Sequence, residues 1–200
     1  MKRNLEYAQM FKQRLYDKIQ ALLDEFAEGR LNRDQFHALY ERYNSRLQIV
    51  DHAILSGNPD AVEIAEMGPT TLQVREETEA KALGLVIYHN TQGTIIETLG
   101  SFNVETRHVL PPLLQFVRTP QETRITHVAE QQWLVFVAGR YTTIVTLFKH
   151  EPSRMQTHEM ERLHRDFEDA NHYAFERGAL DANTLGYPFV AFVQKKLGKA

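Results

Sequence analysis

The sequence predicts an α+β protein with a five-stranded antiparallel sheet. The expected order is strand-strand-helix-strand-strand-strand-helix, preceded by an N-terminal antiparallel helical hairpin. Two observations predict this fold class. Apolar residues recur every three or four positions through the first quarter of the chain, as they do in amphipathic helices. Short segments rich in Val, Ile, Thr and aromatic residues, separated by turn residues, then follow between residues 85 and 148, and such segments are typical of strands.

The hairpin has clear boundary signals. Residues 4–28 form the first amphipathic helix, and Gly29 is placed to end it. Asn32 and Gln35 fit a capping box at the start of a second helix, which runs to about Leu55. Because the connection is so short, the two helices are expected to lie antiparallel.

The second helix carries a seam of apolar residues that alternate spacings of four and three, as in a coiled coil. The residues expected to line this seam as a protein interface are Phe36, Tyr40, Tyr43 and Leu47. Two interpretations stay open: the hairpin packs on the rest of the chain, or it forms a separate arm for dimerisation or partner docking.

The remaining chain reads as a linker, an α/β domain and a tail. Ser56 to Asp60 breaks the helix, and Gly68-Pro69 is a second break. The domain begins with a helix over 73–83. The strands are expected at 85–88, 94–99, 124–129, 133–137 and 141–148, with a hairpin turn at 90–93. The predicted organisation is a helical hairpin over 1–56, a linker over 57–72, the α/β domain over 73–178 and a C-terminal tail over 179–200.

Two further helices belong to the predicted domain. The first covers residues 104–117 with Asn103 as its cap, and Pro111-Pro112 is expected to kink or restart it. The second covers residues 153–177 and ends at Gly178. The apolar tail segment 187–193 either docks on the protein's own core or serves as a partner peptide or membrane-surface helix.

Composition excludes several classes of protein. The 200 residues carry a net charge of -3 with no block of Lys and Arg, which argues against a nucleic-acid-binding protein. There is no cysteine, so disulfides, Cys-ligated zinc and a Cys nucleophile are excluded. No signal peptide is seen, and no apolar run reaches the roughly 18 residues that a membrane span needs. A cytoplasmic protein without a membrane span is expected.

The sequence lacks the common motifs of catalytic and cofactor-binding sites. The sequence has no phosphate-binding glycine loop, no nucleophile elbow and no His-Glu-x-x-His zinc motif. Two Glu-x-x-His pairs occur, Glu105 with His108 and Glu161 with His164, and each could share a helix face. Di-iron bundles need four such helices, so these pairs are interpreted as solvated polar positions. We therefore expect no catalytic residue, no cofactor and no metal.

The order of elements across residues 73–177 resembles the roadblock/dynein-light-chain-seven (LC7) module, a small α/β sandwich similar in shape to longin and profilin-like domains. The residues that carry the resemblance are the strand 85–88, the hairpin turn 90–93, the helix 104–117, the meander 124–148 and the helix 153–177. This sequence departs from the family pattern at Pro111-Pro112, in the preceding hairpin and in the tail. Because family members commonly dimerise through the middle helix, the prolines put that dimer mode in doubt.

The resemblance implies a non-catalytic homodimer that acts as a scaffold or regulator, with a role in regulating a small Ras-like GTPase. The residues expected at a middle-helix contact are Leu113, Leu114, Phe116 and Val117. The alternative is a ligand-sensing module of the GAF or PAS type with the hairpin as a transmission arm. A pocket lined by Tyr88, Phe136 and Tyr141 would favour the sensor, and an enzyme of another type would need convergent polar groups.

Overall fold

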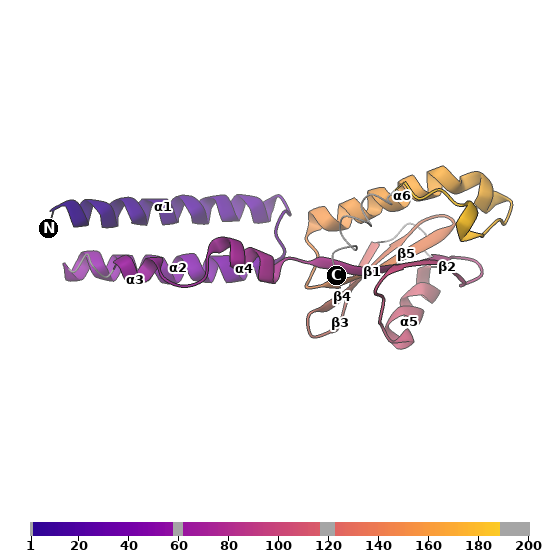
Figure 1. Ribbon diagram of the computed structural model, residues 1–200, viewed down its shortest axis with the longest axis horizontal. Coiled ribbons are helices and arrows are strands. Elements are labelled where there is room, and N and C mark those ends of the chain that lie inside the picture. The colour runs from indigo at the N-terminus through magenta and orange to yellow at the C-terminus, as the bar shows by residue number, and fades with distance from the viewer. Residues whose placement is uncertain (1, 58–61, 117–122, 189–200) are drawn as a thin grey trace. The chain divides into compact units, whose positions relative to one another are not determined.

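The computed structural model describes residues 2–57, 62–116 and 123–188, and Figure 1 shows the course of the chain. The chain divides into two compact units, Met1–Glu79 and Ala80–Ala200. We call them the helical unit and the sheet unit. The division therefore lies after Glu79, whereas the sequence analysis placed the start of the second domain at residue 73.

The described residues of the helical unit form four helices. They are α1 (Lys2–Ala27), α2 (Arg33–Ser56), α3 (Val62–Glu66) and α4 (Thr71–Thr78). The capping box at the start of α2 is present: the Gln35 backbone N–H donates to Asn32 Oδ1 at 2.7 Å, and the Asn32 N–H donates to Gln35 Oε1 at 3.2 Å. Gly29 follows α1 with a φ of 73°, a left-handed conformation that favours glycine at a helix end.

The core of the helical unit follows a seven-residue repeat on α1, where Ala8, Leu15 and Leu22 are buried. On α2 the buried apolar residues are Leu39, Tyr43, Val50 and Ala53. The predicted seam is therefore only partly correct. Tyr43 is buried and Phe36 and Leu47 are partly buried, but Tyr40 is exposed.

Helices α3 and α4 explain why the buried face of α2 differs from the predicted seam. Both pack against α2, which therefore contacts two short helices as well as α1. The Gln35 amide donates to the Arg75 carbonyl at 3.3 Å, and the Tyr43 hydroxyl donates to Thr71 Oγ1 at 3.4 Å. The segment interpreted as a linker over 57–72 thus contains α3 and the first two residues of α4, and the helix expected at 73–83 lies at Thr71–Thr78. Both helices belong to the helical unit.

The sheet unit confirms the predicted fold class. Its elements are β1 (Lys81–His89), β2 (Ile95–Gly100), α5 (Thr106–Phe116), β3 (Thr123–Ala129), β4 (Gln132–Ala138), β5 (Thr142–Lys149), α6 (Arg154–Glu176) and a short 3₁₀ helix, η2 (Ala182–Thr184). The strands form one sheet in the order β2-β1-β5-β4-β3, and every neighbouring pair is antiparallel. Strand β5, the last in the sequence, lies at the centre.

The sheet is covered by one helix on each face (Figure 1). Successive side chains of β5 point to opposite faces of the sheet, as in any pleated strand. Ile144 packs in a cluster with Phe167 of α6, whereas Val145 and Leu147 pack in a cluster with Val109 and Phe116 of α5. Every residue of β5 except the last is buried, because both faces are covered.

Helix α5 differs from the sequence-based expectation in two ways. It begins at Thr106, so Asn103 does not cap it and Val104 lies before it. It also continues through Pro111 and Pro112 as one helix to Phe116, although each proline lacks the N–H that an interior position normally contributes. Burial of Val109 and Phe116 against the sheet stabilises this helix.

The chain after α6 packs on the sheet unit as far as the structure describes it. Leu185 is buried beside Phe167, and the Tyr187 ring stacks on Phe167 with 5.6 Å between the ring centroids. The Asn171 side chain also makes two hydrogen bonds of 2.7 Å to the backbone of Gly186. The first part of the predicted tail therefore belongs to the core, and residues 189–193 of the apolar segment lie outside the described residues.

Because each unit has its own hydrophobic core, we predict that Tyr43→Glu unfolds the helical unit and leaves the sheet unit folded. Tyr43 is only 4% exposed, and burying a carboxylate there costs several kcal/mol. Far-UV circular dichroism should show a large loss of helix. The fluorescence of Trp133, the single tryptophan, should keep its native spectrum, because it lies in β4.

The matched control is Met10→Glu, which introduces the same charge at an exposed position of α1 and should leave both signals unchanged. If Tyr43→Glu lost the native Trp133 spectrum together with the helical signal, the two units would not have independent cores.

Candidate functional site

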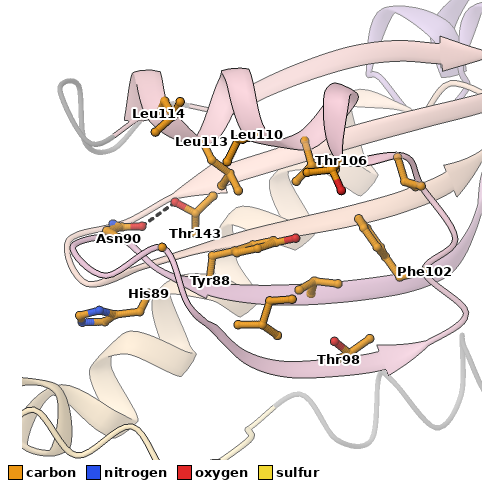
Figure 2. Close-up of a pocket in the computed structure, with 15 residues that line it drawn as sticks. Tyr88, His89, Asn90, Thr98, Phe102, Thr106, Leu110, Leu113, Leu114 and Thr143 are labelled. Carbon is orange, nitrogen blue, oxygen red and sulfur yellow. Dashed lines mark hydrogen bonds between the residues drawn. The ribbon is translucent and has the colours of Figure 1, made fainter.

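A pocket of about 330 Å³ opens between α5 and the β1–β2 side of the sheet. Figure 2 shows α5 on one side of it and the strands on the other, with Tyr88 along the floor. The α5 side contributes Thr106, Val109, Leu110, Leu113 and Leu114, and the remaining wall comes from Val86, Tyr88, His89, Asn90, Gly93, Ile95, Thr98, Phe102, Val104 and Thr143.

The packing of α5 accounts for the place of this pocket. At its C-terminal end, Phe116 packs on Phe136 with 5.8 Å between ring centroids, and the Arg124 guanidinium lies 5.4 Å from the Phe116 ring. These bulky groups fill the space between α5 and strands β3 and β4. On the β1–β2 side, the smaller side chains Leu110 and Leu113 face the sheet, so room for a ligand remains there.

A close backbone approach closes one end of the pocket. A Cβ atom built on Gly84 of β1 would lie 2.4 Å from the backbone oxygen of Ser101, so only glycine fits there. This contact brings the segment after β2 against β1 and places Phe102 and Val104 in the pocket wall. The glycine thus shapes the site without lining it.

Hydrogen bonds between two turns fix the opposite end. Thr143 Oγ1 donates to Asn90 Oδ1 at 2.7 Å, and Asn90 Nδ2 donates to the Gly139 carbonyl at 2.9 Å. Asn90 therefore ties the β1–β2 turn to the β4–β5 turn. Burial lowers the pKa of the neighbouring His89, which favours its neutral form.

Tyr88 supplies the most distinctive polar group of the pocket. Its ring lies along the floor with the hydroxyl directed toward Phe102 and Thr106 (Figure 2). Burial raises the pKa of Tyr88, so the phenol stays protonated and can donate a hydrogen bond. Within the described parts of the chain its hydroxyl has no hydrogen-bond partner, and the threonine hydroxyls of Thr98 and Thr106 lie in the same wall.

The chemistry of the lining selects a class of ligand. The fifteen residues include no Asp, Glu, Lys or Arg. A charged ligand would lose its hydration there without gaining an ion pair, which is unfavourable. The arrangement therefore suits a small uncharged molecule that is mainly apolar and carries a group able to accept a hydrogen bond from Tyr88.

A second cavity of about 800 Å³ lies along α6 beside the β4–β5 turn. Its charged lining has both signs: Arg140 and Arg165 face four carboxylates, those of Glu161, Glu168, Asp169 and Glu176. The most buried of these, Glu168, serves the fold. Its carboxylate accepts hydrogen bonds from the backbone N–H groups of Arg140, Tyr141 and Thr142 at 2.7–2.9 Å.

A buried histidine adjoins Glu168. Thr142 Oγ1 donates to Glu168 Oε1 at 2.9 Å and lies 2.9 Å from His164 Nε2. Because the hydroxyl has one hydrogen, His164 donates from Nε2 to Thr142. Burial lowers the pKa of His164 to about 4, and the negative charge of Glu168 opposes this effect only in part. His164 is therefore neutral at pH 7.

The two Glu-x-x-His pairs do not assemble a metal site. Glu105 pairs with Arg107 at 2.7 Å, and Glu161 pairs with His158 at 2.9 Å, while His164 bonds Thr142. Within residues 2–57, 62–116 and 123–188, no group of three His, Asp or Glu side chains is placed to hold a metal ion.

The structure separates the residues expected at interfaces. Phe36, Tyr40, Tyr43 and Leu47 lie on α2 of the helical unit, as described above. On α5, Leu114 is exposed and Leu113 is half-buried, and both line the pocket. Phe116 is only 1% exposed because it packs on Phe136, so the expectation that it lines a contact surface is wrong for this structure. Val117 lies outside the described residues.

Sequence reasoning anticipated one of the three pocket residues that would favour a sensor. Tyr88 lines the pocket, but Phe136 lies within the core and Tyr141 packs on Phe175 on the α6 side of the sheet. Thr98, Phe102 and Thr106 were missed. Their only local signal is that they flank the connection from β2 to α5, and nothing in that segment reveals that it closes over Tyr88.

Of the helices that the structure describes, none combines the length and apolar character that crossing a bilayer requires. No family model matches the sequence. No curated protein matches it either.

The buried His164 predicts a specific dependence of stability on pH. In the unfolded chain this histidine takes up a proton near pH 6.5, whereas in the folded protein it does so near pH 4. Between these values the unfolded state binds more protons, so the free energy of unfolding falls as the pH falls. The contribution of His164 is of the order of 3 kcal/mol across this window.

Urea unfolding of the sheet unit, followed by Trp133 fluorescence from pH 7.5 to pH 4, measures this effect. His164→Gln keeps an N–H donor for Thr142 and should flatten the pH dependence. His172→Gln, at a half-buried position later on α6, should keep the wild-type slope. Equal slopes in the wild type and in His164→Gln would show that His164 is not the group responsible.

Proposed function

We propose that this chain is a non-catalytic regulatory protein whose sheet unit binds a small, uncharged, mainly apolar molecule. The observation that carries the proposal is the pocket beneath α5, which combines apolar walls with the hydroxyl of Tyr88, a group without a hydrogen-bond partner among the described residues. Its volume of about 330 Å³ lies within the range of small-molecule sites. In this role the chain acts as a ligand sensor.

The polar groups that line the pocket favour ligand binding over catalysis. The polar atoms in its wall are hydroxyl groups, the Asn90 amide and the neutral imidazole of His89. The Asn90 amide and the Thr143 hydroxyl are already engaged with each other. A reacting group would need a nucleophile and a base that face one another, and the pocket wall offers no such pair among its fifteen residues.

The second candidate is the scaffold that the resemblance to the roadblock/LC7 module implies, with a small Ras-like GTPase as the partner class. One observation favours it. Leu110 and Leu114 on α5 are 49% and 60% exposed, and a protein docked on α5 would cover both. The two candidates differ in what fills the pocket: a scaffold that uses α5 for docking predicts no saturable binding of a small molecule.

Two probe molecules of similar shape and different charge test whether the pocket binds a small uncharged ligand. We predict that 2-naphthol binds the full chain saturably, in a 1:1 ratio, and raises the unfolding temperature. The anion 2-naphthoate should bind at least about tenfold more weakly, because the lining offers no cation to replace its hydration. Isothermal titration and thermal unfolding measure both quantities.

Two variants assign the binding to this pocket. Thr98→Phe places a ring in the pocket from an exposed position of β2 and should abolish naphthol binding, whereas Glu97→Phe, on the opposite face of the same strand, should not. Tyr88→Phe removes one hydrogen bond and should weaken binding about fivefold. Naphthol binding that survives Thr98→Phe, or no saturable binding in the wild type, would refute the proposal.

A further inference from the structure

The β4–β5 turn makes contacts with both the wall of the pocket under α5 and helix α6. On the pocket side, the turn and the strand after it hold Asn90. The Asn90 backbone N–H donates to the Tyr141 carbonyl at 2.9 Å, and its Nδ2 donates to the Gly139 carbonyl at 2.9 Å. Its Oδ1 accepts a hydrogen bond from Thr143 Oγ1 at 2.7 Å, and Figure 2 shows this bond at one end of the pocket. The position of Asn90 in the pocket wall therefore depends on the position of the turn.

On the other face of the sheet, a carboxylate of α6 holds the same turn. Glu168, whose side chain is 12% exposed, accepts hydrogen bonds of 2.7–2.9 Å from three successive backbone N–H groups and one hydroxyl. The donors are Arg140, Tyr141 and Thr142, the last through both its N–H and its Oγ1. The contact is tight, because a Cβ atom on Gly139 would overlap the carboxylate. Without Glu168 these N–H groups would need other acceptors, so the turn would be free to leave this conformation.

Two adjacent threonines at the start of β5 join these two sets of contacts. Successive side chains of a strand point to opposite faces of the sheet, so Thr142 faces α6 whereas Thr143 faces α5. Both residues are buried. Thr142 Oγ1 donates to Glu168, and Thr143 Oγ1 donates to Asn90. A movement of the strand start relative to α6 therefore also moves the hydroxyl that holds Asn90.

We propose that Glu168 is a positioning residue for the pocket on the opposite face of the sheet. This inference rests on the proposed function, since it requires that the pocket binds a ligand. Asn90 lines the pocket together with His89 and Gly93 of the same turn, and the hydrogen bonds of Asn90 hold this part of the wall in place. A wall that is already fixed need not be ordered when a ligand binds, and such preorganisation raises affinity. Glu168 thus increases ligand affinity without lining the pocket.

The other parts of the pocket do not depend on this carboxylate. Helix α5 is anchored to the sheet through Val109 and Phe116. The close approach of Ser101 to Gly84 holds the segment that closes the far end. Helix α6 keeps its own contact with the sheet through Phe167, which is fully buried. Loss of the Glu168 carboxylate should therefore loosen one end of the pocket and leave the fold in place.

Isothermal titration of the full chain with 2-naphthol tests the inference in the variant Glu168→Gln. Glutamine keeps one oxygen for the turn but directs an NH₂ group at backbone N–H donors, which it cannot accept. We expect this variant to bind naphthol at least about fivefold more weakly than the wild type. The native Trp133 fluorescence should persist at the temperature of the titration. The matched control is Glu161→Gln, which removes a carboxylate of the same helix and cavity that pairs with His158, and it should bind naphthol like the wild type.

A double-variant cycle separates positioning from a general loss of stability. Asn90→Ala removes the side chain that connects the turn with the pocket wall, and it should weaken naphthol binding by itself. If Glu168 acts through Asn90, adding Glu168→Gln to Asn90→Ala should change the affinity by no more than about twofold. Independent effects would multiply instead, and multiplied effects would overturn the inference.

Thr142→Val is a milder variant that keeps the inference testable if Glu168→Gln does not fold. It removes one of the four hydrogen bonds to Glu168 at nearly constant side-chain volume, and it should weaken naphthol binding about threefold. Wild-type affinity in the folded Glu168 variant, or in Thr142→Val if that variant does not fold, would overturn this inference and leave the proposed function intact. A wild-type chain that does not bind naphthol would refute the proposed function and this inference with it.

Discussion

The sheet unit depends on the burial of strand β5. This strand pairs with β1 on one edge and β4 on the other, and helices cover both of its faces. Without it, β1–β2 and β3–β4 would be two separate hairpins, and an isolated hairpin is marginally stable in water. The hydrophobic clusters under α5 and α6 both include β5 residues, so the site under α5 exists only when this strand is in place.

A partly buried carboxylate holds the start of that strand in place. The Glu168 side chain on α6 holds three backbone N–H groups of the β4–β5 turn and the Thr142 hydroxyl. A Cβ atom on Gly139 would lie 2.4 Å from Glu168 Oε2, so the turn needs glycine to let the carboxylate approach. The same turn bonds Asn90 through Gly139, which connects the α6 side of the sheet with the end of the pocket.

The fold class was predictable because its signals are local. Alternating and continuous apolar segments marked the strands, and Asn32 with Gln35 marked the start of α2. Helix α3 has a weak local pattern and forms where α2 can cover it, so sequence reasoning placed a linker there. Helix α4 was expected as a helix, but at 73–83 rather than at Thr71–Thr78. The pocket was only partly predictable, because it needs Tyr88 to meet α5 and Asn90 to meet Thr143, which is 53 residues away.

The central place of the last strand also sets an order for folding during synthesis. Residues of the helical unit leave the ribosome first and can form their core while the sheet unit is still being made, since domains generally fold as units in this direction. The sheet unit must wait until Lys149 has emerged, and until then β1 and β4 each have an unpaired edge. Such edges are prone to pair with other chains, so the nascent protein is most vulnerable to aggregation in this interval.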